Sequence, residues 1–210
     1  MKRIGLAVMA ALALSISTAA QADQLRSGVY ALRSVPGAQL DYRKLYLAVD
    51  NGHITGFFDN PSTAPAANHP DRDPTCRFLL KSTSVARNEV DFATQFGGAQ
   101  GQPISVSSNA KGVWSVRVHG DLPNCDVPTI STGDALTFSA ERAWIGFATV
   151  ASQRARLYAK PEAPAATRAY LVKDDVAAVL ARKGDWVRVD YFFRGTDLIR
   201  WIRRSDLRTE

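Results

Sequence analysis

The sequence predicts an all-β protein, with an antiparallel β-sandwich or barrel first and a second, smaller β-barrel after it. Short runs in which apolar and polar residues alternate recur along most of the chain, as expected for half-buried strands. Turn-forming residues separate these runs. Between residues 23 and 150 no apolar pattern of helical period lasts more than two turns. We therefore expect about seven short strands in that part.

The first part opens with strands at Gly28–Leu32, Lys44–Val49 and Ile54–Phe58. Asp50-Asn51-Gly52 separates the last two, and Asn-Gly between β-rich runs is a strong signal for a hairpin turn. Residues 59–75 contain four prolines and few large apolar side chains, which predicts a long exposed loop. Further strands are expected at Cys76–Leu80, Glu89–Thr94, Ile104–Ser107, Gly112–Val118 and Ala135–Ser139.

The first 22 residues have the three parts of a secretory signal peptide. Lys2 and Arg3 precede an apolar stretch from Gly5 to Ile16, and Ala20-Gln21-Ala22 is a small-residue cleavage site. The apolar stretch is shorter than the roughly 20 residues that span a bilayer. We expect cleavage after Ala22, a periplasmic or secreted product without a membrane span, and two domains at 23–150 and 151–210.

The two cysteines, Cys76 and Cys125, both lie in the first domain. Export places them in an oxidising compartment, so we predict that they form a disulfide. Closing a loop of this size stabilises a fold by about 3 to 4 kcal/mol in the chain-entropy model. The alternative is a free nucleophilic thiol.

The second part contains four motifs in a fixed order. They are Arg-Leu-Tyr-x-x-Pro from residue 156, Tyr-Leu-Val-Lys-x-Asp-Val-x-x-Val-Leu from 170, Gly-Asp-Trp-Val-Arg-Val-Asp-Tyr from 184 and Trp-Ile-Arg-Arg-Ser-Asp-Leu from 201. This order resembles the bacterial SH3 family over about 60 residues. The resemblance implies a small SH3-like β-barrel and a role at the cell wall. Arg200 departs from the family pattern, which commonly has Gly before the last Trp.

In so small a barrel the inward side chains must supply nearly the whole core. We expect that core to contain Val176, Val179, Trp186, Val187, Val189 and Ile202. Trp186 and Trp201 each have an alternative position, exposed in a ligand groove.

Charge is unevenly distributed between the two domains. Residues 23–150 hold 11 Lys/Arg against 12 Asp/Glu, whereas residues 151–210 hold 13 against 8. A basic second domain suits anionic cell-wall polymers, lipid headgroups or an acidic protein, although a solvated arginine-rich surface has the same composition. Export argues against nucleic acid as a partner.

Three consecutive aromatic residues, Tyr191-Phe192-Phe193, follow the Gly-Asp-Trp strand. Side chains alternate between the faces of a strand, so the three rings cannot all enter one core. Surfaces rich in arginine and aromatic residues are typical of binding sites. We therefore predict a binding patch, with the interface between the domains as the alternative location for the exposed ring. The residues of the patch are Tyr191, Phe193, Arg194, Arg200 and Trp201.

No set of residues specifies a reaction. His119, Asp121 and Asp126 form a candidate acid/base group beside Cys125, but no nucleophile is identifiable from spacing. His69, Asp71 and Asp73 carry metal-ligating groups, but Pro70 and Pro74 favour an open solvated loop. We expect no catalytic residue, cofactor or metal.

These observations favour a periplasmic, non-enzymatic binding protein. Its expected partner is peptidoglycan or a protein acting on it, and an inhibitor or immunity factor is one form of this role. The first alternative is an envelope enzyme or enzyme subunit with its active site near His119. The second is a small-ligand carrier, in which the first domain is a calycin-like barrel with an internal cavity.

Overall fold

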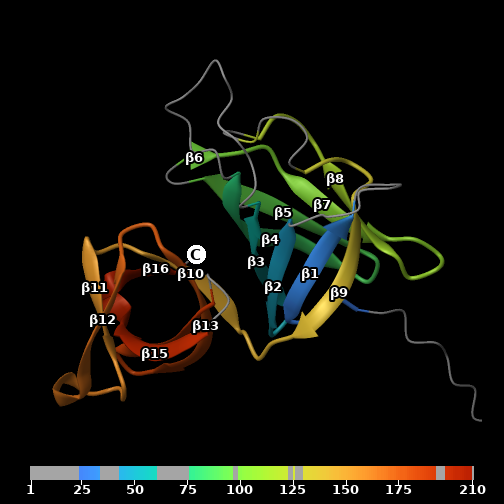
Figure 1. Cartoon of the computed structure of the whole chain (residues 1–210). Coiled ribbons are helices and arrows are strands. Elements are labelled where there is room, and N and C mark those ends of the chain that lie inside the picture. Colours follow the sequence, from blue (N-terminus) through green and yellow to red (C-terminus); the bar gives the residue numbers. More distant parts are fainter. Residues whose placement is uncertain are drawn as a thin grey trace, which may run out of the picture.

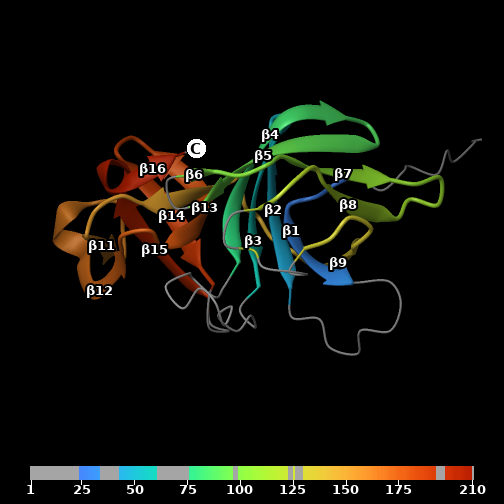
Figure 2. The same ribbon diagram turned by 90° about the horizontal axis from the view of Figure 1, so that it is seen from above.

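The structure, a computed structural model, describes residues 24–33, 43–60, 76–96, 99–122, 125, 130–192 and 197–209. The chain is all-β, as predicted, and forms an eight-stranded antiparallel barrel and a second sheet that lie side by side (Figures 1 and 2). Among the described residues no helix is long and apolar enough to cross a membrane.

The barrel is an up-and-down meander in which consecutive strands pair and β9 returns to pair with β1. β4 also pairs with β5, which closes the ring, and β6 is a short strand beside β5. The strands are β1 (Gly28–Arg33), β2 (Lys44–Asp50), β3 (His53–Asp59), β4 (Arg77–Ala86), β5 (Glu89–Phe96), β6 (Ala99–Gln100), β7 (Ile104–Ser108), β8 (Trp114–Val118) and β9 (Ala135–Glu141).

Two local features explain how the strands join. Asn51 and Gly52 both have positive φ, 49° and 80°, in the turn between β2 and β3, as a two-residue hairpin turn of type I′ requires. Gly28 has φ 154°, and a Cβ there would lie 2.2 Å from the carbonyl oxygen of Ala140. Closure of the barrel between β1 and β9 therefore depends on a glycine at position 28.

Side chains fill the interior of the barrel. Seven side chains from five of its strands have no accessible surface: Leu32, Leu45, Leu47, Phe58, Phe92, Ile104 and Val106. A cavity large enough for water would leave accessible surface on the side chains that line it, so none touches these seven.

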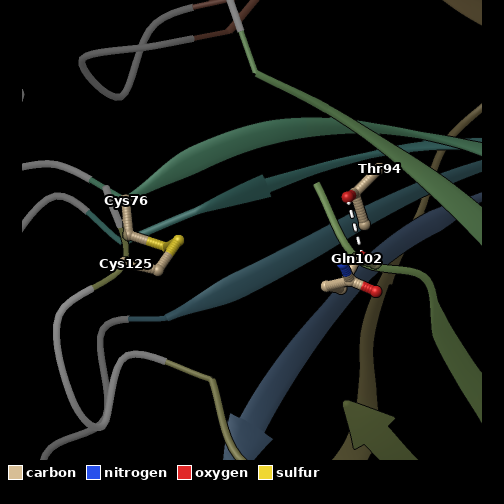
Figure 3. Close-up of a disulfide and its surroundings, with 4 residues drawn as sticks. All are labelled: Cys76, Thr94, Gln102 and Cys125. Atoms are coloured by element: carbon tan, nitrogen blue, oxygen red, sulfur yellow. Dashed lines mark hydrogen bonds between the residues drawn. A yellow bond between two sulfur atoms is a disulfide. The ribbon is translucent and has the colours of Figure 1, made fainter. Parts of the chain in front are cut away.

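One end of the barrel carries the disulfide. Cys76 and Cys125 are bonded, as predicted, with their Cα atoms 4.7 Å apart. The bond ties the start of β4 to the connection between β8 and β9 (Figure 3). At the same end Thr94 Oγ1 donates a hydrogen bond of 2.9 Å to the carbonyl oxygen of Gln102, which holds the start of the β6–β7 connection against β5 (Figure 3). Cys125 packs against the barrel core, so this connection helps to close the end.

The second sheet has seven strands in the order β12-β11-β15-β14-β13-β10-β16. β10 precedes the expected domain boundary at residue 151, yet it pairs with β13 and β16 of this sheet. Two 3₁₀ turns, η1 (Ala163–Ala165) and η2 (Arg204–Asp206), lie between strands. The strands are β10 (Gly146–Val150), β11 (Arg154–Tyr158), β12 (Ala166–Val172), β13 (Val176–Lys183), β14 (Trp186–Tyr191), β15 (Leu198–Arg203) and β16 (Leu207–Thr209).

The core of the second sheet contains four of the six expected residues, Val179, Val187, Val189 and Ile202, each without accessible surface. The prediction for Val176 was wrong, and Trp186 is buried but lies outside this core cluster. Val176 packs against the barrel, because residues 176, 178 and 180 occupy the side of β13 opposite to Val179. Trp186 lies on the outer side of β14, because it is separated from Val187 and Val189 by an odd number of positions.

Candidate binding surface

The outer side of the second sheet is divided into two regions. Strands β10 and β13 turn toward the barrel, and their side chains join outward side chains of β1 to β4 in one apolar cluster. In both views β11 and β12 lie on the side away from the barrel (Figures 1 and 2). The outer side of β12, β11, β15 and most of β14 is therefore left uncovered by the barrel.

This uncovered region carries alternating arginine and aromatic side chains, and we call it the arginine–aromatic face. On β14 and β15, Trp186 pairs with Arg203 and Arg188 pairs with Trp201. Directly paired residues of antiparallel strands share one side of the sheet. Tyr158 of β11 pairs in turn with Trp201, and Ile199 lies two residues before Trp201 on the same side.

The arginine–aromatic face continues onto β11 and β12. Arg156 pairs with Tyr170, and Arg154 pairs with Val172. Arg168 lies two residues before Tyr170 and shares its side of the strand. These five residues complete the face, whose eleven side chains include five arginines.

Two of the arginines have their guanidinium groups over aromatic rings. The guanidinium carbon of Arg203 is 4.0 Å from the centroid of the Trp186 ring, and that of Arg154 is 3.7 Å from the Tyr170 ring. Tyr158 meets the Trp186 ring edge-on, with centroids 4.8 Å apart. Stacking on a ring orients a guanidinium group through its planar face. Its N–H donors then point outward from its edge, where they can bind a carboxylate or a phosphate.

No described carboxylate neutralises this face. Elsewhere in the described chain Arg43, Arg77 and Arg208 form ion pairs with Asp134, Asp59 and Asp174. None of the five arginines of the face has a described carboxylate within the 4.0 Å of an ion pair. The face therefore presents a concentrated positive charge to solvent.

The structure distributes the predicted patch residues over different places. Trp201 lies half-buried on the arginine–aromatic face. Tyr191 packs against the core of the second sheet, and its hydroxyl donates to Asp175 Oδ1 at 3.5 Å. Arg200 is half-buried, and its Nη1 donates to the carbonyl oxygen of Ile199 at 2.7 Å. Phe193 and Arg194 lie outside the described residues.

Phe192, the middle ring of the aromatic run, lies at the junction with the barrel, the alternative location expected for a ring of this run. Its ring centroid is 4.7 Å from that of Tyr46 and 4.8 Å from that of Trp144. Burial raises the pKa of the Tyr46 phenol; Asp59 raises it further and Arg77 lowers it. Tyr46 therefore stays protonated at neutral pH and acts here as an aromatic packing group.

Sequence reasoning missed most of the arginine–aromatic face, although a signal for it was present. Arg154, Arg156 and Tyr158 recur with a period of two, as do Trp186 and Arg188. This period puts them on one side of each strand. The prediction instead followed the consecutive rings at 191–193, of which Tyr191 packs in the core and Phe192 at the junction.

In the candidate acid/base group, His119 contacts a serine, and no described hydrogen bond joins it to an aspartate. Nε2 of His119 lies 2.9 Å from Oγ of Ser105, which is 2 % exposed, while His119 is exposed. Asp126 lies outside the described residues, and Asp121 is exposed without a described hydrogen bond to the ring. The described residues contain no group of three metal-ligating side chains, and the 69–73 segment lies outside them.

Comparisons with protein-family models, with curated proteins and with solved structures found no match for this chain.

Proposed function

We propose that this chain is an exported, non-enzymatic binding protein that engages a partner in the bacterial cell envelope. The signal peptide at 1–22 is removed after Ala22, and the mature protein acts in the periplasm. The second sheet serves as a bacterial SH3-like barrel. Its partner is peptidoglycan or a protein acting on it, and inhibition of such a protein is one form of the role.

One observation carries this proposal, namely the clustering of five arginines and four aromatic rings on one uncovered sheet face. Arginine, tryptophan and tyrosine are the residues that contribute most energy at binding surfaces. Leaving five cations without described acidic partners lowers the stability of the free protein slightly through self-repulsion. A ligand with anionic groups offsets that repulsion on binding.

Export has independent support from the disulfide. Structural disulfides persist in oxidising compartments and are rare in the bacterial cytosol. The Cys76–Cys125 bond joins residues 49 positions apart and is part of the packed end of the barrel. Fractionation of cells that express the full chain, followed by N-terminal sequencing, is expected to give a periplasmic protein that begins at Asp23.

Binding is tested with purified sacculi and with periplasmic extract. The double variant Arg156→Ala/Arg203→Ala removes two charges from the face. Arg87→Ala/Arg117→Ala removes two charges from exposed positions of the barrel and is the matched control. Wild type and control are expected to sediment with sacculi or to retain a periplasmic protein, and the face variant is expected to lose that partner. Equal behaviour of the two variants would refute the proposed site.

The Ser105–His119 contact favours the enzyme alternative, since a serine hydroxyl held by an imidazole is the first element of an activated nucleophile. A fluorophosphonate probe distinguishes the two functions. Labelling of Ser105 that disappears in His119→Ala would establish the alternative. The proposed binding function predicts no labelling, because the hydroxyl is buried beneath the ring.

A further inference from the structure

The composition of the arginine–aromatic face differs from that of a general cationic surface. Its eleven side chains include five arginines, and one lysine, Lys183, lies at its edge, where it pairs with Trp186. Three of its members are among the large apolar side chains that remain most exposed in the described chain: Tyr170 at 44 %, Val172 at 46 % and Ile199 at 37 %. Enrichment in arginine and aromatic residues with depletion of lysine and acidic residues is typical of the centre of protein–protein interfaces.

Two of the four aromatic rings of the face are poorly placed to bind sugars. A sugar ring stacks on an open aromatic face, but Trp186 is only 9 % exposed beneath Arg203 and beside Tyr158. Arg154 covers one face of Tyr170. Guanidinium edges and aliphatic groups therefore form much of the outermost layer, and these groups complement the carboxylates and apolar side chains of another protein.

The register gives two of the arginines matching positions on adjacent strands. Tyr158 of β11 pairs with Trp201 of β15. Arg156 lies two residues before Tyr158, and Arg203 lies two residues after Trp201, so extending this antiparallel register sets the two positions opposite each other on the same side. Like charges at such positions repel, and no described carboxylate separates them. A carboxylate between them would accept hydrogen bonds from both guanidinium groups.

We propose that the arginine–aromatic face binds an acidic protein, and that an aspartate or glutamate of that protein lies between Arg156 and Arg203. Val172, Ile199 and Tyr170 provide the apolar contacts around this ion pair. The inference rests on the proposed envelope-binding function and selects a protein over the polymer as the partner.

Photo-cross-linking in the native host tests the location of the partner. A benzoylphenylalanine placed at Val172 or Ile199 reports on the face, and one at Val85 or Val113 reports on the barrel. Val85 and Val113 are matched controls, since they are 47 % and 46 % exposed. The face positions are expected to give one discrete adduct with an acidic protein that the barrel positions do not give.

The adduct supports the proposal only when its partner has been purified and the binding reconstituted. Arg156→Glu/Arg203→Glu is expected to weaken that binding by about 30-fold or more, as removal of one member of a buried charge pair does. Replacing the matching acidic residue of the partner with arginine is expected to restore binding to this variant and not to wild type. A partner that binds the charge-reversed variant as well as wild type would overturn the proposal.

Sacculi and vesicles of phosphatidylglycerol identify the competing outcomes. One such outcome is that wild type gives no protein adduct and sediments with sacculi in a way that requires Arg156 and Arg203. The partner would then be the polymer. In that case the inference fails, but the proposed function stands. Arginine-dependent sedimentation with vesicles alone would make the partner a lipid surface and overturn the inference. If no probe binds, both the inference and the proposed function fail.

Discussion

Trp144 donates a hydrogen bond of 2.9 Å from its indole Nε1 to Oδ2 of Asp190, across the junction between the barrel and the second sheet. Trp144 lies in the connection between β9 and β10 and is 1 % exposed; Asp190, on β14, is 3 % exposed. The second carboxylate oxygen of Asp190 is buried without a hydrogen-bond partner. Burial raises the pKa of Asp190; the Trp144 hydrogen bond and Arg142 lower it, and Asp197 raises it.

Asp190 makes the free energy of unfolding dependent on pH. Because its pKa is raised in the folded state, the native protein binds more protons than the unfolded chain at pH values between the unfolded and folded pKa. Its contribution to stability therefore falls as pH rises through that window. Asp190→Asn removes the buried charge, keeps an acceptor for Trp144 and is expected to stabilise the protein by about 1 kcal/mol at pH 7.

Urea unfolding at a series of pH values measures this effect. The stability advantage of Asp190→Asn is expected to shrink as pH falls toward the unfolded pKa of about 3.9. Glu89→Gln, at an exposed position of the barrel, is the control for a general change in charge. If the stability advantage of Asp190→Asn grew on acidification, Asp190 would not be the group that causes this pH dependence of stability.

Phe192 is expected to hold the second sheet against the barrel, because its ring packs against those of both Tyr46 and Trp144. Phe192→Ala is expected to cost about 3 kcal/mol, the lower end of the range for phenylalanine truncation, since the ring is half-buried. Phe192→Leu retains apolar volume and is expected to cost less. Urea unfolding followed by tryptophan fluorescence measures both, and a loss below about 0.5 kcal/mol for the alanine variant would contradict the assigned role.

A buried ion pair is expected to stabilise the disulfide end of the barrel. Arg43 Nη1 lies 2.6 Å from Asp134 Oδ2, and both side chains are less than 10 % exposed. Arg43→Ala leaves the Asp134 carboxylate without its cation and is expected to cost about 3 to 5 kcal/mol in the free energy of unfolding.

Arg208→Ala is the matched control for this pair. It breaks the Arg208–Asp174 ion pair, whose side chains are half exposed, and is expected to cost under about 1 kcal/mol. Chemical denaturation of both variants gives the comparison. Similar losses of unfolding free energy for the two variants would contradict the assignment of the Arg43–Asp134 pair as a stabilising buried ion pair.

The disulfide is expected to stabilise the fold by limiting the freedom of the unfolded chain. Cys76→Ala/Cys125→Ala opens a loop of 49 residues and is expected to cost about 3 to 4 kcal/mol. Urea unfolding with and without reductant checks this: reductant should destabilise wild type and leave the double variant unchanged. A variant as stable as oxidised wild type would show that the bond does not contribute through chain entropy.

Much of the secondary structure was predictable from local patterns. The strands around Leu47 and Phe57 follow from short runs of apolar and aromatic residues, and the turn between them follows from Asn51-Gly52, whose positive φ values suit few other residues. The Cys76–Cys125 bond followed from the pairing of two cysteines behind a leader sequence. These features depend on neighbours in the sequence or on composition, so no long-range contact was needed to infer them.

Most strand positions, the hairpin turn and the cysteine pairing could be predicted from the sequence, because each is encoded within a few residues or by residue type. Only the tertiary structure decided that β9 returns to β1, that β10 joins the second sheet, and that Trp186 and Arg203 lie outward together. Alternation separates the two sides of a strand but does not reveal which side another element covers. In β10 every residue is buried, so no alternation remained to reveal either face.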